Sequence, residues 1–346
     1  MKSDQENVII TFGFTCYNQK KEIIEALESI ALMDKPYLYE IIVGDDGSSD
    51  GSPDAIKTFA SEHMLNVKVL EPNGVPSTGV ARRIIKNKTR IVLAAKGRYC
   101  LMGDGDDGWC DSGFVKNAIN ILDERPDISA VFHAFAYLYQ DGTKKEHHPF
   151  RRSGLINPFE YIAYNSYSHF GTFVFRTPTG RNRARFEKRG FDDVSLSFWC
   201  ASCGKFYYVD RVVYNYRQYE NSGWMSMREE VRNFLESVNG IWGISKYPGL
   251  FCSISAHFWR QFRFVRRNFQ LYPAALQGCA RLNKEEAQQA RRTWLFWAMW
   301  EYIGFACKMF WNIKRLMRQL LPSNCVYESV ALLCLFVQSM GVRTCW

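Results

Sequence analysis

The sequence predicts an α/β fold, in which a mostly parallel sheet carries helices on both faces, followed by an α-helical C-terminal region. Three observations support this prediction. Short apolar segments alternate with amphipathic segments over residues 1–140, and such alternation is typical of parallel strands joined by crossover helices. Acid- and glycine-rich runs follow two of the apolar segments. From about residue 221 the alternation stops and basic and aromatic residues accumulate, which predicts two domains, 1–220 and 221–346.

The predicted strands are short runs of apolar residues bounded by turn residues. They cover residues 7–16, 39–44, 67–70, 99–102 and 130–139. The predicted helices show apolar residues at helical spacing, and they lie around 23–30, from Ser52 onward, at 84–95 and at 114–122. Ser52 suits an N-cap, and Pro53 suits the first helical turn.

The charge of the chain is unevenly distributed. The 346 residues carry 44 Lys and Arg against 35 Asp and Glu, a formal net charge of +9. Residues 1–220 hold 28 of each sign, whereas residues 221–346 hold 16 cations and 7 anions. The whole excess therefore lies in the last third, and the bulk field of the first two thirds does not favour polyanions. No nucleic-acid-binding motif accompanies the basic residues, so we do not expect a nucleic-acid partner.

The 11 cysteines are scattered and mostly lie in apolar runs, where a free thiol behaves as a small hydrophobic group. The pair Cys200 and Cys203 has no second pair and no histidine at zinc-finger spacing. The N-terminal segment lacks the charged and apolar pattern of a signal peptide. These observations indicate a reducing cytosol.

Two acidic runs follow predicted strands, DDGSSDGS at 45–52 and DGDDG at 104–108. The carboxyl ends of parallel strands meet at the ligand-binding edge of an open sheet, so these carboxylates would lie close together. Carboxylates that crowd one site repel each other unless a cation is held between them. Oxygen ligands suit Mg²⁺ or Mn²⁺, which typically bridge to phosphates. The alternative is a pair of ordinary Asx turns.

The runs fit neither of two common motifs. The position equivalent to the last ligand of a calcium EF-hand is Val115, and the first strand is followed by FGFTCYN instead of the glycine pattern of a dinucleotide site.

Three segments resemble family 2 glycosyltransferases, which are inverting enzymes with the GT-A fold. VIITFGFTCYNQ is similar to the family's first strand and turn, YEIIVGDDGSSDGS to its "E-I-I-V-V-D-D-G-S-T-D" segment, and AAKGRYCLMGDGDDGW to its D-x-D segment. The resemblance is good over about 8–125 and weaker to about 220. It implies a sugar-nucleotide donor and a divalent metal.

The resemblance implies roles for individual residues at the donor site. Thr15 and Asp46 would hold the nucleobase and ribose, together with their neighbours Tyr17, Asn18 and Asp45. Asp104 and Asp106 would form the D-x-D pair that binds ribose and metal, and Asp107 would support the metal site. The basic residue that approaches the donor would lie in the stretch 82–90, where Arg82 and its neighbour Arg83 match by residue type and Lys88 matches by its distance from Asp104. The Arg217 side chain would reach the diphosphate.

An inverting transfer also needs a base that takes the proton of the acceptor hydroxyl. In the family this carboxylate follows the D-x-D by 80 to 100 residues, in an acidic pair that opens a helix. Asp193 fits the base and Asp192 fits a supporting acid. The alternative is that both acids only stabilise a helix N-terminus. His169 is either a contact of a ligand or acceptor, or a structural histidine.

The C-terminal region has the composition of a membrane-surface helix. Residues 293–311 are apolar and rich in Trp and Phe. If the segment is helical, Glu301 and Lys308 lie on one face together with the polar residues Asn312, Arg315 and Gln319 that follow. Basic and aromatic residues favour anionic lipid at the membrane interface. The alternatives are a helix docked on the catalytic domain and a true membrane span.

The sequence therefore predicts a metal-dependent inverting glycosyltransferase. It would move a sugar from a nucleoside diphosphate sugar, with UDP as the favoured nucleotide, to a hydroxyl of a glycan. By resemblance, the acceptor is a lipid-linked oligosaccharide at the cytoplasmic face of a bacterial inner membrane, in polysaccharide or glycoprotein assembly. The alternatives are a catalytically silent membrane-associated scaffold and a nucleotidyltransferase.

Overall fold

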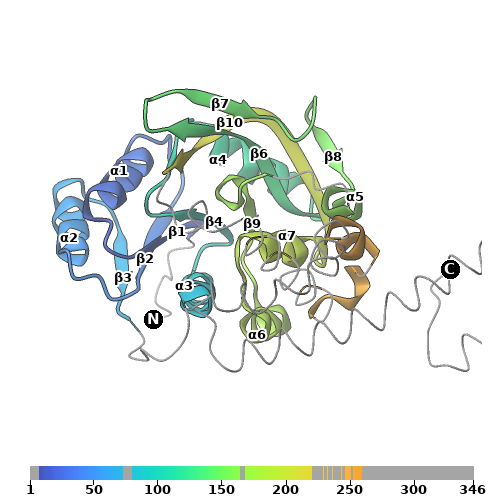
Figure 1. Ribbon diagram of the computed structural model, residues 1–346, viewed down its shortest axis with the longest axis horizontal. Helices are drawn as coiled ribbons and strands as arrows, with labels where there is room; N and C mark the ends of the chain where they lie inside the picture. The colour runs from blue at the N-terminus through green and yellow to red at the C-terminus, as the bar shows by residue number, and fades with distance from the viewer. Residues whose placement is uncertain are drawn as a thin grey trace, which may run out of the picture. The chain divides into compact units, whose positions relative to one another are not determined.

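The computed structural model describes residues 8–72, 80–163 and 168–219, and beyond them positions 229, 232, 236, 243, 246–250 and 252–258. Its elements form a mixed sheet flanked by helices (Figure 1). The strands are β1 Ile10–Cys16, β2 Tyr39–Asp45, β3 Val67–Leu70, β4 Tyr99–Asp104, β5 Gly108–Trp109, β6 Ile128–Tyr139, β7 Lys144–His147, β8 Gly154–Ile156, β9 Val174–Arg176 and β10 Lys205–Gln218. The helices are α1 Lys20–Ala31, α2 Ser52–Glu62, α3 Val80–Ala94, α4 Phe114–Glu124, α5 Pro158–Ala163, α6 Gly180–Arg189 and α7 Asp193–Ala201, with 3₁₀ turns η1 Phe170–Thr172 and η2 Pro248–Leu250.

The sheet follows the order β3-β2-β1-β4-β9-β6-β10-β5, with β7 paired to β6 and β8 paired to β10. Strands β3, β2, β1 and β4 are parallel, as are β6 and β10. The short strand β9 is antiparallel to both of its neighbours, β4 and β6. The predicted mostly parallel α/β fold is confirmed, and the predicted strand positions agree with the observed ones to within a few residues.

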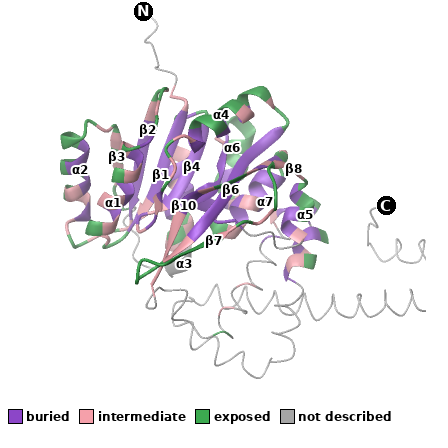
Figure 2. Ribbon diagram, turned by 90° about the horizontal axis from the view of Figure 1, so that it is seen from above, coloured by how far each residue is buried: buried purple, intermediate pink, exposed green. Residues whose placement is uncertain are grey.

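The central strands are buried on both faces because helices cover each side of the sheet (Figure 2). Ile10, Phe12 and Phe14 of β1 have no exposed surface. In helix α1, Ile23, Leu27 and Ile30 form the buried stripe that the sequence predicts. Continuous apolar runs such as that of β1 are expected where a parallel strand is covered twice.

Glycine lets helix α3 approach the sheet closely. A β-carbon on Gly44 would lie 2.3 Å from Asn87 Oδ1 and 2.8 Å from Ile91 Cδ1. The Asn87 side-chain amide also donates to the Gly44 carbonyl oxygen at 2.7 Å. This contact fixes α3 against the carboxyl end of β2, and Lys88 is the next residue along that helix.

None of the helices that the structure describes combines the length and hydropathy needed to cross a bilayer. The predicted C-terminal helix at 293–311 lies outside the described residues, and so does most of the region 221–346.

Candidate active site

The carboxyl ends of three parallel strands bring both acidic runs to one edge of the sheet. Strand β1 pairs with β2 and β4, so that Thr15 lies opposite Gly44 on one side and Asp104 on the other. Cys16 is in register with Asp45. The predicted common location of the runs 45–52 and 104–108 is therefore confirmed, at the position where open α/β sheets bind ligands.

The first acidic run folds into a turn around Asp45. The Asp45 carboxylate accepts hydrogen bonds from the N–H groups of Gly47 and Ser48 at 2.9 and 3.0 Å, and from the Ser48 hydroxyl at 2.5 Å. The residue is buried. These bonds give Asp45 the part of an Asx-turn residue that shapes the loop.

Asn18 joins this loop to the loop that follows β1. Its N–H donates to Ser48 Oγ at 2.9 Å, and its Oδ1 accepts from the Ser49 N–H at 2.8 Å. The backbone of Asn18 has a φ of 52°, a left-handed conformation that Asn tolerates better than most residues. Asn18 thus holds two loops together.

Tyr17, Asp46 and Arg83 line the accessible side of these loops. The Tyr17 side chain is half exposed, and its ring centroid lies 5.8 Å from the Arg83 guanidinium carbon. Arg83 Nε lies 3.6 Å from Asp46 Oδ2. At such an edge an aromatic ring can stack on a base, a carboxylate can accept from ribose hydroxyls, and a guanidinium can pair with phosphate. Arg83 belongs to the basic stretch 82–90 in which the sequence does not decide the residue that approaches the donor, and nothing in its spacing distinguishes it from Arg82.

Asp104, at the end of β4, is held by two partners. The Thr15 hydroxyl donates to Asp104 Oδ1 at 2.8 Å, and Lys88 Nζ lies 3.1 Å from the same oxygen. Thr15 was predicted to contact the nucleoside, and in this structure its hydroxyl orients Asp104. Lys88 was one of the candidates for the basic residue. The side chain of another, Arg82, lies outside the described part of the chain.

The Lys88 ammonium links Asp104 to Asp193. Only 2% of the Lys88 side chain is exposed, and Nζ donates to Asp193 Oδ1 while lying 3.8 Å above the Phe170 ring centroid. Burial alone would lower the pKa of Lys88, but the Asp104 and Asp193 carboxylates hold it above its usual value. Burial tends to raise the pKa of Asp104, but the Lys88 charge acts together with the hydrogen bonds from Thr15 and Lys88, and the pKa of Asp104 lies below its usual value. One buried cation therefore keeps two carboxylates from different elements together.

The structure gives Asp192 and Asp193 different tasks. The Asp192 side chain accepts from the Ser195 N–H at 2.8 Å, and the Ser195 hydroxyl accepts from the Asp192 N–H at 2.8 Å, which is a capping box for α7. The Asp193 carboxylate instead points to Lys88, with 47% of its side chain exposed. Surrounding protein raises the pKa of Asp193 to about 6 against the pull of Lys88. Because water reaches half of the side chain and offsets this effect, we take Asp193 as ionised at pH 7.

This division of tasks makes a testable prediction. Asp192→Ala should lower the free energy of unfolding by about 1 kcal/mol, the usual cost of a lost N-cap, while sugar-nucleotide turnover stays within a few-fold of wild type. Ser195→Ala removes the other half of the same capping box and is the matched control. Urea denaturation and the rate of nucleotide release measure the two effects. Loss of turnover without loss of stability would contradict the assignment.

Asp107 supports the turn that carries the D-x-D pair. Its carboxylate accepts from the Tyr214 hydroxyl at 2.9 Å and from the Arg217 N–H at 2.8 Å, and the residue is buried. The Arg217 guanidinium pairs with Glu25 of α1. Arg217 was predicted to reach a diphosphate; in this structure its backbone holds Asp107, and its side chain is anchored to a helix.

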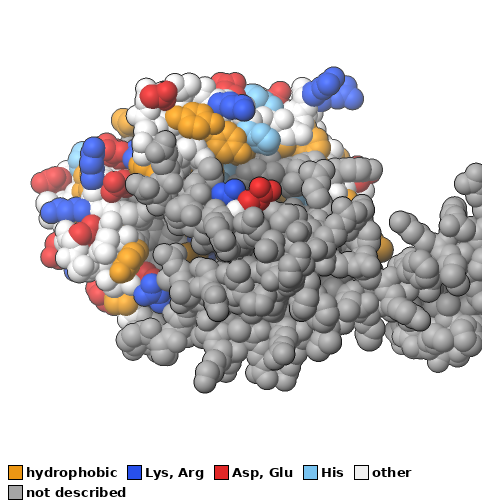
Figure 3. Space-filling model, in the orientation of Figure 1, with side chains coloured by type: hydrophobic (Ala, Val, Ile, Leu, Met, Phe, Trp, Pro, Cys, Tyr) orange, Lys and Arg blue, Asp and Glu red, His pale blue; other side chains and the backbone are white. Residues whose placement is uncertain are grey.

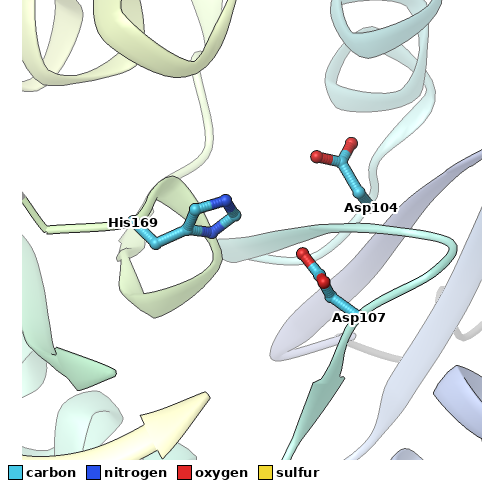
Figure 4. A group of neighbouring side chains, drawn as sticks. All are labelled: Asp104, Asp107 and His169. Atoms are coloured by element: carbon cyan, nitrogen blue, oxygen red, sulfur yellow. The ribbon is translucent and has the colours of Figure 1, made fainter. Parts of the chain in front are cut away.

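Asp104, Asp107 and His169 could together hold a metal ion. One ligand atom from each lies within 4.8 Å of the others, and Figure 4 shows the Asp107 carboxylate facing the His169 ring with Asp104 beside them. His169 Nδ1 accepts from the Gly171 N–H at 3.2 Å, which assigns its proton to Nε2. Metal-bound histidines normally donate through the second nitrogen, so His169 in this arrangement suits a hydrogen-bond donor better than a ligand. Burial lowers its pKa to about 3 and keeps it neutral.

Asp106 is the carboxylate that best fits a bound cation. Among the described residues no side chain hydrogen-bonds to the Asp106 carboxylate, whose hydrogen bond comes from its own backbone N–H, whereas other residues engage both oxygens of Asp107. Burial, followed by the charge of Asp104, raises the pKa of Asp106 to about 6. The pKa of Asp107 is also raised well above its usual value, by burial and by the charges of Asp106 and Asp104. This mutual repulsion is what a hard divalent cation removes, so the donor set fits one.

Part of the chain is similar in sequence to two curated mycobacterial proteins. The uncharacterized protein Rv1520 of Mycobacterium tuberculosis and its counterpart Mb1547 of Mycobacterium bovis are each 29% identical to this chain over 134 residues, 38% of this chain and 37% of each relative. The chain thus matches little more than a third of the length of these curated relatives.

The structure is similar to that of S. aureus TarS 1–349 in complex with UDP-GlcNAc, with a TM-score of 0.56, 18% identity, and coverage of 83% of this chain and 79% of that one. This likeness shows the fold.

The family comparison covers more than half of the chain. The model of glycosyl transferase family 2 matches residues 11–190, a range that includes the acidic edge, Lys88 and the elements that position them. The chain therefore belongs to glycosyl transferase family 2.

Proposed function

We propose that the protein is an inverting glycosyltransferase that moves a sugar from UDP to a hydroxyl of a glycan acceptor. The observation that carries the proposal is the shared contact of Lys88 with Asp104 and Asp193. This contact holds Asp104, which would face the donor diphosphate, beside Asp193, which would face the acceptor. A single displacement needs the leaving group and the base at opposite sides of one sugar carbon, held at close range.

The donor would bind along the edge formed by β1, β2 and β4. Tyr17 offers a half-exposed ring for the base, and Asp46 offers a carboxylate for ribose hydroxyls. Arg83 lies beside both and supplies a cation for phosphate. The UDP-GlcNAc bound by TarS supports UDP as the nucleotide. The rigid loop held by Asp45 and Asn18 would keep this surface in place before the donor arrives.

A divalent cation, Mn²⁺ or Mg²⁺, would be held by Asp106 together with Asp104. When bound, it supplies Lewis-acid stabilisation to the leaving diphosphate. The chain's own residues prepare this place: Thr15 and Lys88 orient Asp104, and Tyr214 and the Arg217 N–H fix the turn through Asp107. His169, with its proton on Nε2, would donate a hydrogen bond toward the carboxylate oxygens of Asp104 and Asp107.

Asp193 would act as the base. Its carboxylate is half exposed and opens α7, so an acceptor hydroxyl can reach it from solvent. The acceptor oxygen would bond to the anomeric carbon as the bond from that carbon to the diphosphate oxygen breaks and UDP leaves; the hydroxyl proton would move to Asp193, and the anomeric carbon would be inverted. Lys88 would hold the ionised carboxylate in position until the proton arrives.

The acceptor would be a lipid-linked glycan at the cytoplasmic face of a bacterial membrane. Support for this part comes from the sequence of residues 221–346, whose net charge of +9 and aromatic content suit an anionic lipid surface. The enzyme would then be a peripheral protein that meets its acceptor at the membrane.

Removal of metal tests the donor site. EDTA should weaken UDP binding at least tenfold, and added Mn²⁺ should restore it, because the diphosphate would otherwise face several carboxylates without a bridging cation. Asp106→Asn should show the same loss without EDTA. Isothermal titration with UDP gives the affinity, and CMP serves as a ligand control without a diphosphate. UDP affinity that is indifferent to EDTA would contradict the metal role.

The function itself is tested with a panel of nucleotide sugars. Hydrolysis of a UDP-sugar that releases UDP and free sugar, with inversion seen by proton NMR of the first-formed anomer, is the expected result. Release of pyrophosphate from a nucleoside triphosphate would indicate a nucleotidyltransferase. Failure of every donor to bind would favour the silent scaffold.

A further inference from the structure

Helix α6, Gly180–Arg189, carries a concentrated basic surface that the donor site does not use. It contains Arg181, Arg183, Arg185, Lys188 and Arg189 with a single acid, Glu187. Only Phe186 is buried, and Arg189 is partly buried. The remaining cations of α6 are exposed, and among the described residues none of them pairs with a carboxylate.

The cations form a stripe on the outer side of the helix. Arg181, Arg185 and Lys188 are spaced at i, i+4 and i+7, so they share one face. Phe186 points about 130° away from the middle of that stripe on a helix with 100° per residue, and it packs against Phe191 and Trp199. The helix is therefore anchored by one aromatic side chain and presents its cations outward.

This charge is unusual for the domain. Residues 1–220 are neutral as a whole, and over α1 and α2, at the left of Figure 3, cations and anions are interspersed. Helix α3 is also basic, but Arg83, Lys88 and Arg90 are engaged with the acidic edge. Its exposed Lys86 adds to the charge near α6, because α3 packs beside α6 (Figure 1).

We propose that the Arg181, Arg185 and Lys188 face of α6 docks on an anionic phospholipid surface. The inference rests on the membrane location proposed above and adds a contact within the catalytic domain. A convex helix with cations on its outer face matches a flat layer of phosphate headgroups, whereas a flexible polyanion would be held better in a groove. Each cation near such a surface contributes about 1 kcal/mol.

Helix α6 precedes the proposed base Asp193 by only a few residues. Its last residue, Arg189, is followed four residues later by Asp193, and successive Cα atoms are 3.8 Å apart, so the base lies within roughly 15 Å of the end of the basic helix. Docking through α6 would therefore keep the base close to the headgroup plane, where the sugar of a lipid-linked acceptor begins.

The test compares two full-length variants with the same change in charge. One carries Arg181→Gln, Arg185→Gln and Lys188→Gln; the control carries Lys57→Gln, Lys116→Gln and Lys144→Gln, three exposed lysines on other elements. Binding is measured by flotation with vesicles of phosphatidylglycerol and phosphatidylcholine, and with phosphatidylcholine alone. The α6 variant should bind the anionic vesicles at least tenfold more weakly than wild type, and the control should remain within about twofold.

Each other outcome overturns the inference. Equal weakening of both variants would indicate only bulk charge, and unchanged binding of the α6 variant would leave any membrane contact to residues 221–346. Binding to single-stranded RNA that depends on α6, without vesicle binding, would assign the surface to a polyanion. Titration with UDP separates these results from the proposed chemistry: a wild-type protein that binds UDP but no vesicles loses the membrane location and keeps its donor site.

Discussion

Asp193→Asn is expected to lower kcat for sugar transfer by about a thousandfold, because an amide cannot accept the proton of the acceptor hydroxyl. The substitution keeps the size of the side chain and its place at the first turn of α7, so UDP binding should stay within about threefold of wild type. The measurement is UDP release from a UDP-sugar, with water as acceptor where no glycan is at hand, combined with UDP titration.

Asp192→Asn is the matched control for this result. Asp192 precedes the base by one residue and makes the capping box, in which an amide oxygen can still accept from the Ser195 N–H. Its turnover should be near that of wild type. A fully active Asp193→Asn enzyme would remove the base assignment and leave Asp193 as a partner of Lys88 alone.

Lys88→Met should impair both stability and donor binding. The substitution leaves Asp104 and Asp193 without the buried ammonium that neutralises them, and removal of one partner of a buried ion pair costs about 3 kcal/mol of unfolding free energy. The freed Asp104 should also rotate away from Thr15, so that UDP binding weakens at least tenfold. Urea denaturation and UDP titration give the two values.

The exposed neighbour Lys86 provides the control for Lys88. Lys86→Met makes the same chemical change on the same helix at a solvated position, where the expected loss of stability is below about 0.5 kcal/mol. Lys88→Arg should keep part of the stability, since the charge remains, but its wider guanidinium does not fit the place above Phe170. Equal stability of Lys88→Met and Lys86→Met would show that the Lys88 contacts contribute little.

Much of the fold could be predicted because its strands are continuous apolar runs. β1, β2 and β4 are buried on both faces, so their sequences show no polar alternation and end abruptly at the acidic turns. Strand β9 is only three residues long and antiparallel, and a segment so short has no periodicity to read. Its place between β4 and β6 depends on tertiary pairing that no local pattern encodes.

The sequence predicts which residue types gather at the candidate site, but it does not predict which of their side chains contact one another. The sequence does not decide whether Arg82 or Lys88 approaches the donor, because a hydropathy pattern predicts that every lysine or arginine is exposed. The three consecutive polar residues Asn87, Lys88 and Thr89 are all buried, and only the geometry of α3 on the sheet decides which of the basic residues meets Asp104. Thr15 and Arg217 are predicted to contact the donor, and in the structure each also hydrogen-bonds to a carboxylate of the acidic edge, a contact that residue type alone does not reveal.

The place of β9 has a consequence for how the protein is made. The strand sits between β4 and β6 although it follows both in the chain, so each of those strands has an unpaired edge until residue 176 has been synthesised. Strands β1 to β4 are complete at residue 104, so they leave the ribosome about 70 residues before the strand that completes the edge of β4. A fragment that ends at residue 125 would lack β9 and expose the pairing edge of β4, so we expect it to aggregate.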